Sequence, residues 1–263
     1  MLITLSPAKT LNLDPQSQTK KHSTPDFLRE SAALIARLRK LSKPQIAALM
    51  GVSDKLAANV VAYVKSWAAP FDAANAKQAV LTFMGDVYEG LAARDFKPRD
   101  FEVAQKHLRI LSGLYGLLRP LDLMQPYRLE MGCGLQSRGG RKADRFSSLY
   151  DFWGEKITVA LNESLAAAGS DVLVNLASAE YFRSVRGDVL NATVITPVFK
   201  DEKSGRYKVI SFFAKKARGR MARFIIKNRI KNPADIKGFD LDGYHFSPSM
   251  STEREWVFAR PEK

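Results

Sequence analysis

Hydrophobic residues recur along the chain with two different periods, and these periods divide it into helical and extended segments. Apolar positions three and four residues apart predict one helix from 24 to about 40 and another over 99–107. Short apolar runs predict strands at 2–5, 108–111 and 171–176, and an extended piece at 80–83. Because strand and helix patterns alternate, we expect an α/β or mixed α+β fold.

The second half of the chain continues this alternation. Ser147 or Ser148 caps one long predicted helix that ends at Gly169. The runs 189–200 and 207–214 predict a hairpin. Further pieces are a short helix opening at Gly85-Asp86, another over 179–185, and extended segments near Tyr244 and 256–258. No repeat or low-complexity linker interrupts the pattern, so we expect residues 1–263 to form a single compact domain, a mixed sheet wrapped by helices.

The segment 42–67 predicts two short helices joined by a tight turn. Ser42 begins a capping-box pattern at the start of the first helix. Gly51 can adopt a positive φ angle and end that helix, after which Ser53 or Asp54 caps the second one. The turn therefore leaves the amino end of a helix next to a glycine.

This turn is a candidate site for a phosphate group. The first N–H groups of a helix lack intrahelical partners and carry a partial positive charge, so a DNA phosphate can lie over Val52, Ser53 and Lys55. The pattern Gly51-Val-Ser-x-x-x-Ala57 also resembles the helix-hairpin-helix motif of proteins that bind the DNA backbone without reading sequence, with Ser53 where that motif usually has a second glycine. The alternative is an ordinary corner between two packed helices.

Charge points to a polyanionic partner. The chain has 41 Lys plus Arg against 27 Asp plus Glu, which gives a net charge of +14. Eight of the basic residues, and no acidic one, lie within 215–231. On a helix, the positions Lys216, Arg220, Arg223, Lys227 and Lys231 form one stripe beside an apolar face. Such a stripe needs counter-charge, either from a nucleic acid or from acidic loops of the same chain.

Composition also limits the kinds of site that the chain can form. Cys133 is the only cysteine and the three histidines lie far apart, so we expect no intrachain disulfide, no metal centre and no cofactor. The first residues are too short for a signal segment, and no run approaches the roughly 18 apolar residues of a membrane span. We expect a cytoplasmic monomer with no membrane partner.

Three arginines occur among apolar neighbours in the Gly- and Pro-rich stretch after residue 107. A buried, unpaired guanidinium costs several kcal/mol, so Arg109, Arg119 and Arg128 each need an acidic partner or a ligand. Asp122 and Glu130 can pair with two of them. The following Gly/Arg-rich stretch, 134–145, predicts an exposed loop.

Several segments together resemble one family, the YaaA family of bacterial peroxide-stress proteins. The similarity extends over about residues 1–260. It rests on Ser6-Pro-Ala-Lys-Thr-Leu11, Ser53-Asp-Lys-Leu-Ala57, Gly85-Asp-Val-Tyr88, Leu111-Ser-Gly-Leu-Tyr-Gly116, Arg119-Pro-Leu-Asp-Leu-Met-Gln-Pro-Tyr-Arg-Leu-Glu-Met-Gly132, Asn175-Leu-Ala-Ser178, Glu180-Tyr-Phe182, Lys215-Lys-Ala-Arg-Gly219 and Arg223-Phe-Ile-Ile226. The resemblance implies a single α/β domain of unusual topology, described as cantaloupe-like. It also implies double-stranded DNA binding through a helix-hairpin-helix and a positive cleft, and a role in limiting peroxide damage and intracellular free iron.

The first functional hypothesis is a sequence-nonspecific double-stranded DNA-binding protein of the peroxide response, without catalytic residues. Its candidate contacts are Lys9, Lys43, Gly51, Val52, Ser53, Lys55, Arg119, Arg128, Lys215, Lys216, Arg218, Arg220, Arg223 and Lys227. The alternative is an enzyme acting on a phosphorylated or nucleotide substrate, for which no known catalytic motif is present. Its candidate site gathers Lys9, Asp86, Arg128, Glu130, Lys215 and Lys216. A deep polar pocket favours the enzyme, and an open basic groove beside the turn favours DNA.

Overall fold

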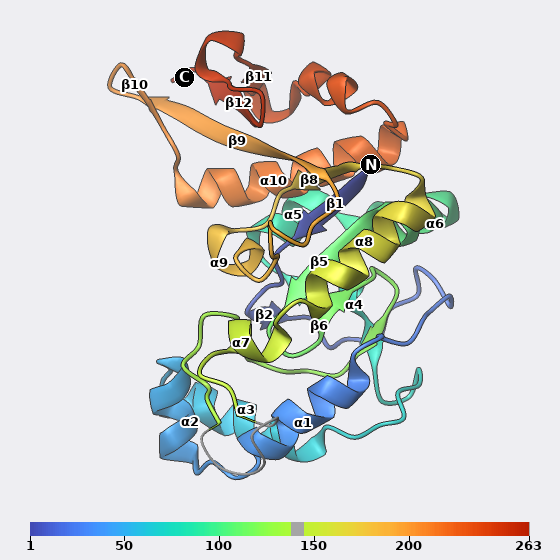
Figure 1. Cartoon of the computed structure of the whole chain (residues 1–263), viewed down its shortest axis with the longest axis vertical. Helices are drawn as coiled ribbons and strands as arrows, with labels where there is room; N and C mark the ends of the chain where they lie inside the picture. The colour runs from blue at the N-terminus through green and yellow to red at the C-terminus, as the bar shows by residue number, and fades with distance from the viewer. Residues whose placement is uncertain (138–144, 263) are drawn as a thin grey trace.

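A mixed β-sheet of eight strands forms the centre of the computed structural model, which describes residues 1–137 and 145–262. Seven strands follow the order β11-β12-β9-β8-β1-β5-β6, and β10 pairs with β9 (Figure 1). The fold is therefore of the α/β class, as the interleaved pattern predicts. The strands are β1 (Leu2–Leu5), β5 (Leu108–Ser112), β6 (Gly116–Leu118), β8 (Val172–Asn175), β9 (Thr193–Lys203), β10 (Arg206–Lys208), β11 (His245–Phe246) and β12 (Glu255–Arg260).

Helices surround this sheet, and two small two-stranded sheets lie beside it. The small sheets pair β2 (Thr10–Leu11) with β4 (Phe83–Met84) and β3 (Lys77–Gln78) with β7 (Leu123–Met124). The helices are α1 (Leu28–Leu38), α2 (Lys43–Met50), α3 (Asp54–Ser66), α4 (Ala79–Thr82), α5 (Asp86–Leu91), α6 (Pro98–His107), α7 (Leu149–Trp153), α8 (Lys156–Ala168), α9 (Ala179–Phe182) and α10 (Ser211–Asn228). Figure 1 shows α1, α2 and α3 together at one end of the molecule and β9, β11 and β12 at the other.

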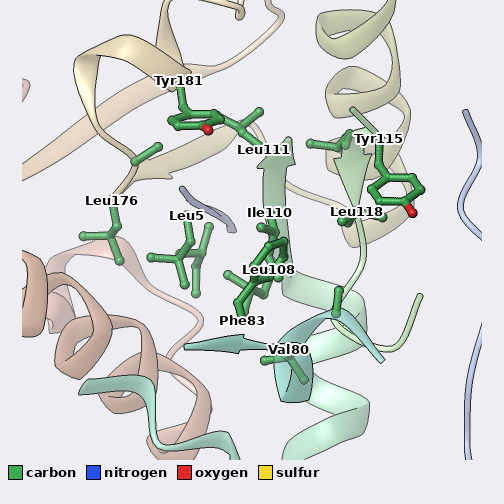
Figure 2. Close-up of a cluster of buried hydrophobic side chains, with 14 of the residues drawn as sticks. Leu5, Val80, Phe83, Leu108, Ile110, Leu111, Tyr115, Leu118, Leu176 and Tyr181 are labelled. Carbon is green, nitrogen blue, oxygen red and sulfur yellow. The ribbon is translucent and has the colours of Figure 1, made fainter. Parts of the chain in front are cut away.

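The central strand β1 is buried along its whole length, because parallel strands flank it on both sides. Ile3 lies opposite Leu108 of β5 and Val174 of β8. All three side chains are fully buried. Figure 2 shows the apolar cluster that continues from Leu5 of β1 and the residues of β5. Strands buried on both faces read as continuous apolar runs, which is why the sequence identifies them well.

The order of the strands reverses at β1. The chain passes from β1 to β5 on one side, and after β6 it crosses back to β8 on the other side before continuing outward to β9 and β12. The loop after β1 and the loop after β8 therefore start at neighbouring carboxyl ends and lead to opposite sides of the sheet. In open α/β sheets a crevice forms at such a point, and ligands commonly bind there.

Two glycines bring α5 and α10 into backbone contact. A Cβ atom at Gly219 would lie 1.8 Å from the Val87 carbonyl oxygen, and one at Gly90 would lie 2.1 Å from the Lys216 carbonyl oxygen. Only hydrogen fits at both positions. This close approach holds the start of α5 beside the first turns of α10.

The predicted helix pair within 42–67 is present as α2 and α3, whose axes bend by 109° at the break. Ser42 and Gln45 form the expected capping box, and Gly51 ends α2 at φ 59°. Ser53 caps α3 and its Oγ accepts a hydrogen bond from the Leu56 N–H at 3.4 Å. Each predicted local signal is confirmed here, because caps and turns depend on neighbours in sequence.

Several predicted boundaries are wrong. The piece expected to be extended at 80–83 is largely the helix α4, whose residues are all buried. A uniformly buried apolar run carries no periodicity that distinguishes strand from helix. The first long helix begins at Leu28 rather than at 24. The single helix expected before Gly169 is two helices, because Gly154 adopts φ 49° between α7 and α8.

The basic segment also differs from its prediction at both ends. β9 and β10 form the predicted hairpin, but β10 ends at Lys208 and α10 begins at Ser211, so 211–214 is helix rather than strand. α10 ends at Asn228, followed by Arg229 at φ 53°. Lys231 therefore lies beyond the helix and does not belong to the predicted stripe. The predicted loop at 134–145 falls largely on 138–144, outside the described residues.

In the described ranges 1–137 and 145–262, we find no single helix that is long and apolar enough to span a membrane. The bent pair α2 and α3 meets the criteria of length and composition only when the two helices are counted together.

Candidate functional site

A pocket of about 420 Å³ lies at the carboxyl ends of β1 and β8. The loop after β1 contributes Ser6 to Thr10, and the segment after β8 contributes Leu176, Ser178 and Glu180. Opposite walls come from the start of α5, from 127–130 and from α10. The pocket thus occupies the point at which the strand order reverses.

Hydrogen bonds join the two loops at the base of this pocket. The Ser6 Oγ accepts from the Ser178 backbone N–H at 2.8 Å and lies 3.3 Å from the Ser178 Oγ. The Tyr88 hydroxyl of α5 donates to the Ser6 carbonyl oxygen at 3.0 Å. Three separate elements are therefore tied together beneath the cavity, which gives the pocket a defined shape.

Two cations of the pocket share one carboxylate. The Lys9 Nζ lies 2.6 Å from Glu130 Oε2, and an Arg128 guanidinium nitrogen lies 3.3 Å from Glu130 Oε1. Glu180 is held differently, since its Oε1 accepts the Gly132 N–H at 2.9 Å. Glu130 is thus an internal partner of Arg128, in line with the prediction that Glu130 and Asp122 pair with two of the three arginines.

Several donors of the pocket are not satisfied by the protein. Within the ranges that the structure describes, the guanidinium of Arg218 has neither an ion-pair nor a hydrogen-bond partner, and partial burial lowers its pKa. The Nε of Arg128 is buried and also has no partner. Lys215, one turn before Arg218 on α10, is exposed at the same pocket. These groups can accept an anion.

Tyrosines complete the wall. Tyr127 and Tyr181 line the cavity, and Tyr88 lies beside it. Burial raises the pKa of all three hydroxyls well above their ordinary value. They stay neutral near pH 7, so they act as hydrogen-bonding and apolar surface rather than as charges.

The turn between α2 and α3 lies in solvent. Gly51, Ser53 and Lys55 are exposed, and Val52 is half-buried. Lys43 is engaged with Asp54 at 2.7 Å, across the start of both helices. The turn borders a second cavity of about 480 Å³, whose far side contains Glu130 and Glu180. The two cavities therefore meet along these two carboxylates.

The cationic stripe of α10 is largely paired with the protein's own acids. Arg220 lies 3.3 Å from Asp242, and Arg223 lies 3.6 Å from Asp95. Lys227 lies 2.8 Å from Asp100. Burial of Asp100 acts to raise its pKa, but hydrogen bonds and the charge of Lys227 outweigh burial and lower it. Internal acids thus supply the counter-charge that the stripe needs, while Lys216 is half-buried against α5.

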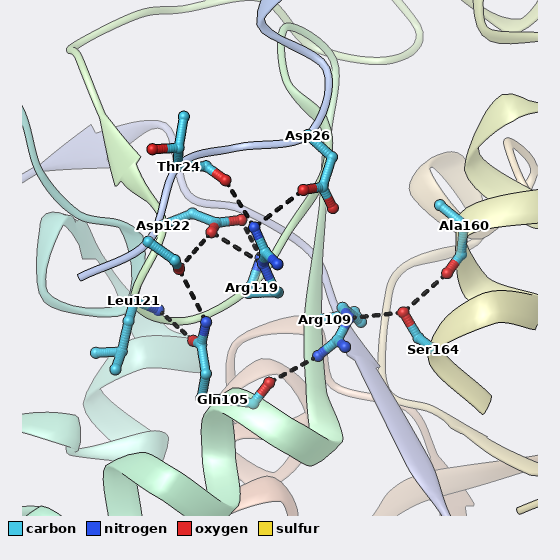
Figure 3. A network of polar contacts seen from close by, with 10 residues as sticks. Thr24, Asp26, Gln105, Arg109, Arg119, Leu121, Asp122, Ala160 and Ser164 are labelled. Atoms are coloured by element: carbon cyan, nitrogen blue, oxygen red, sulfur yellow. Dashed lines mark hydrogen bonds and ion pairs between the residues drawn. The ribbon is translucent and has the colours of Figure 1, made fainter. Parts of the chain in front are cut away.

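Arg109 and Arg119, two of the three arginines expected to need a partner, are held by the protein itself (Figure 3). Arg119 contacts Asp122 at 3.0 Å and Asp26 at 3.0 Å, so Asp122 pairs with one of the three arginines, as predicted. Arg109 donates to the Ser164 hydroxyl at 3.0 Å and to two backbone carbonyls. Burial lowers the pKa of Arg109 to about 10. Arg109 is therefore buried, whereas Arg119 is half-buried and its guanidinium is engaged by two carboxylates.

Of the residues that sequence reasoning singled out, the pocket brings together Lys9, Arg128, Lys215 and Arg218, with Asp86 and Glu130 beside them. The turn at 51–55 does not line this pocket; Gly51 borders the neighbouring cavity, which shares Glu130 and Glu180 with the pocket. Figure 1 shows α2 and α3 at one end of the molecule. Sequence reasoning missed Ser178, Glu180 and Tyr181 as wall residues, because no local pattern indicates which loops meet. Within the part of the chain that the structure describes, no group of three or more His, Cys, Asp or Glu side chains is placed to hold a metal ion.

Comparison with known proteins shows which family the chain resembles. The sequence profile of a family described as "Peroxide stress protein YaaA" matches residues 1–250. A relative from Colwellia psychrerythraea (strain 34H), named "UPF0246 protein", is 55% identical over 262 residues, which cover 100% of both chains. The family match includes the pocket and the turn between α2 and α3.

Proposed function

Because the chain belongs to the YaaA family of peroxide stress proteins, we propose that it binds the phosphate backbone of double-stranded DNA during the response to hydrogen peroxide. Binding without sequence preference protects the duplex by covering it. We include in the proposal that the protein limits intracellular free iron, as the sequence resemblance implies.

The observation that carries the DNA proposal is the exposed turn at the start of α3. Gly51 adopts φ 59° and α3 is 13 residues long, so the turn presents the amino end of a full helix to solvent. The N–H groups of its first turn have no intrahelical acceptors and carry partial positive charge. Lys55 adds a full charge beside them. A backbone phosphate bound here is contacted without any base being read.

A salt-dependent titration tests this proposal. Fluorescence anisotropy of a labelled duplex is measured with the wild-type protein and with Lys55→Gln, at several NaCl concentrations. Affinity is expected to fall steeply with salt, and loss of one phosphate contact reduces the log–log slope by about 0.9. Lys65→Gln is the matched control, because Lys65 is exposed at the opposite end of α3. Affinity that is independent of salt, or equal in Lys55→Gln and the wild type, contradicts the proposal.

A second candidate function is supported by the pocket. Five of the six residues of the enzyme hypothesis, all except Lys216, line one cavity: Lys9, Asp86, Arg128, Glu130 and Lys215. Convergent polar groups in a concave site are typical of small-molecule binding. We propose action on a small phosphorylated molecule as the alternative, and product formation from such a substrate is the observation that distinguishes it from DNA binding alone.

A further inference from the structure

We propose that the pocket at the carboxyl ends of β1 and β8 binds a small phosphomonoester of the sugar-phosphate class. The inference rests on the second candidate function only for the presence of a ligand, and it requires no reaction. It is separate from DNA binding at the turn between α2 and α3.

The place of the pocket in the sheet is the first argument. β1 and β8 are parallel neighbours whose following connections run in opposite directions, so their carboxyl ends open a crevice. Such a crevice is where open α/β sheets bind their ligands. The cavity of about 420 Å³ is within the usual range of small-molecule sites, about 300–1,000 Å³. It has room for an organic group as well as an anion.

Unsatisfied donors are the second argument. Arg218 is half-buried at the pocket, and its guanidinium has no ion-pair or hydrogen-bond partner within residues 1–137 and 145–262, so its donors are available to an anion. The Nε of Arg128 is buried without an acceptor, and Lys215 adds an ammonium group at the same cavity. A single anion contacting these groups satisfies donors from two separate segments of the chain.

The number of cations favours phosphate over a carboxylate. A phosphomonoester carries about −1.5 to −2 charges near pH 7 and three strong acceptor oxygens. A phosphate therefore matches two or three cationic donors better than a carboxylate does, because a carboxylate has only two oxygens and one charge. The Arg fork contacts two phosphate oxygens at once, and a lysine contacts a third as a point charge.

The other lining residues of the pocket indicate what the phosphate is attached to. Asp86 and Glu180 line the pocket as acceptors, and Asp86 has no ion pair or hydrogen bond through its side chain in the described part of the chain. Carboxylates repel the phosphate but accept hydrogen bonds from hydroxyl groups. Leu176, Tyr127 and Tyr181 supply apolar surface in the same pocket. A phosphate linked to a ring that bears hydroxyl groups fits this combination of cations, acceptors and apolar surface.

Isothermal titration calorimetry of the full-length protein tests the proposal with ribose 5-phosphate, ribose and inorganic phosphate as probes. Ribose 5-phosphate is expected to bind at least about ten times more tightly than ribose, since charge-assisted hydrogen bonds contribute more than neutral ones. Equal binding of ribose and ribose 5-phosphate overturns the phosphate site. Inorganic phosphate that binds as tightly as ribose 5-phosphate overturns the sugar part of the proposal.

Variants locate the binding site. Arg218→Gln is expected to weaken ribose 5-phosphate binding by about tenfold or more, and the exposed Lys215→Gln by a smaller factor. Arg206→Gln, an exposed arginine on β10, is the matched control and is expected to bind as the wild type does. Removing an unpaired, partly buried charge does not weaken the fold, so Arg218→Gln is expected to unfold at or above the wild-type temperature without ligand.

Wild-type affinity in both Arg218→Gln and Lys215→Gln overturns the proposal. The calorimetric titration contains no nucleic acid, so its failure leaves the anisotropy result with duplex DNA unaffected. Conversely, a failure of Lys55→Gln to change DNA binding leaves the calorimetric result unaffected.

Discussion

Arginine side chains illustrate how residue-scale environment decides role in this protein. Arg119 is half-buried and contacts Asp122, Asp26 and a backbone carbonyl, so its charge is paired within the protein. Arg109 is buried with hydroxyl and carbonyl acceptors only. Arg218 has no such partners within the described residues. The same residue type thus serves structure at two positions and remains available for a ligand at the third.

Cys133 supports a residue-scale prediction about redox chemistry. Burial raises the pKa of its thiol to about 11, and nearby Glu130 and Glu180 act in the same direction. The thiolate is the reactive form, so Cys133 is expected to react slowly near pH 7. The rate of iodoacetamide labelling, followed by intact mass, is expected to rise about tenfold per pH unit between pH 7 and 10.

The control for this measurement is the same protein unfolded in urea, in which the cysteine pKa returns to about 8.5. Labelling at pH 7 that is as fast in the folded as in the unfolded protein contradicts the prediction. A slow folded-state rate means that Cys133 does not act as a rapid peroxide sensor, although the family responds to peroxide.

At the scale of elements, the contact between α5 and α10 determines where the pocket lies. Gly90 and Gly219 allow the two backbones to touch, which brings Asp86 and Val87 to the same cavity as Lys215 and Arg218. A glycine within a helix lowers its intrinsic stability by about 1 kcal/mol relative to alanine. In α10 that cost is offset by the close packing that glycine permits.

Substitution of Gly219 tests this contact. A Cβ at this position would meet the Val87 carbonyl oxygen at 1.8 Å and the Leu91 nitrogen at 2.7 Å, and both are backbone atoms that cannot rotate away. Gly219→Ala is expected to lower the free energy of unfolding by about 1–3 kcal/mol or more. Urea denaturation followed by circular dichroism measures the change.

Gly187→Ala is the matched control. No atom lies within 4 Å of a Cβ built at Gly187, and its φ angle is not positive. The control is expected to change stability by no more than about 0.5 kcal/mol. If Gly219→Ala is as stable as this control, the two helices do not require the close contact.

At the scale of the whole molecule, a net charge of +14 remains after the internal pairs are formed. The pairs on α10 neutralise cations locally but do not change that sum. Like charges on a compact body repel, and most of the pairs are partly exposed and contribute little each. Repulsion among these positive charges is therefore expected to lower the free energy of unfolding.

Thermal unfolding at different salt concentrations tests this balance. Raising NaCl from about 10 to 150 mM shortens the Debye length from about 30 to 8 Å and screens the repulsion. The unfolding temperature is expected to rise by about 2 °C, which corresponds to somewhat under 1 kcal/mol for a chain of this size. Sucrose at equal osmolality is the control, because it does not screen charges and any shift that it causes is a general solvent effect. A fall in unfolding temperature with NaCl means that attractive pairs outweigh repulsion.

Local interactions explain what could be predicted from the sequence. Leu2–Leu5 and Leu108–Ser112 are buried runs, and the Ser42 and Ser53 caps and the Gly51 turn depend on neighbours a few residues away. These features were predicted correctly, as was the α/β class. Errors arose where local signals were ambiguous, as in α4, or where one residue interrupts a periodic pattern, as Gly154 does.

By itself the sequence determined the alternation of elements, the caps of α2 and α3, the excess of positive charge and the family to which the chain belongs. Only the tertiary structure decided that Arg220, Arg223 and Lys227 meet internal acids, and that Arg218 faces a pocket with Lys9 and Arg128. The physical reason is the distance along the sequence over which each kind of interaction acts. Caps and periodicity arise within a few residues, whereas charge pairing and cavities depend on which distant segments the sheet order places side by side.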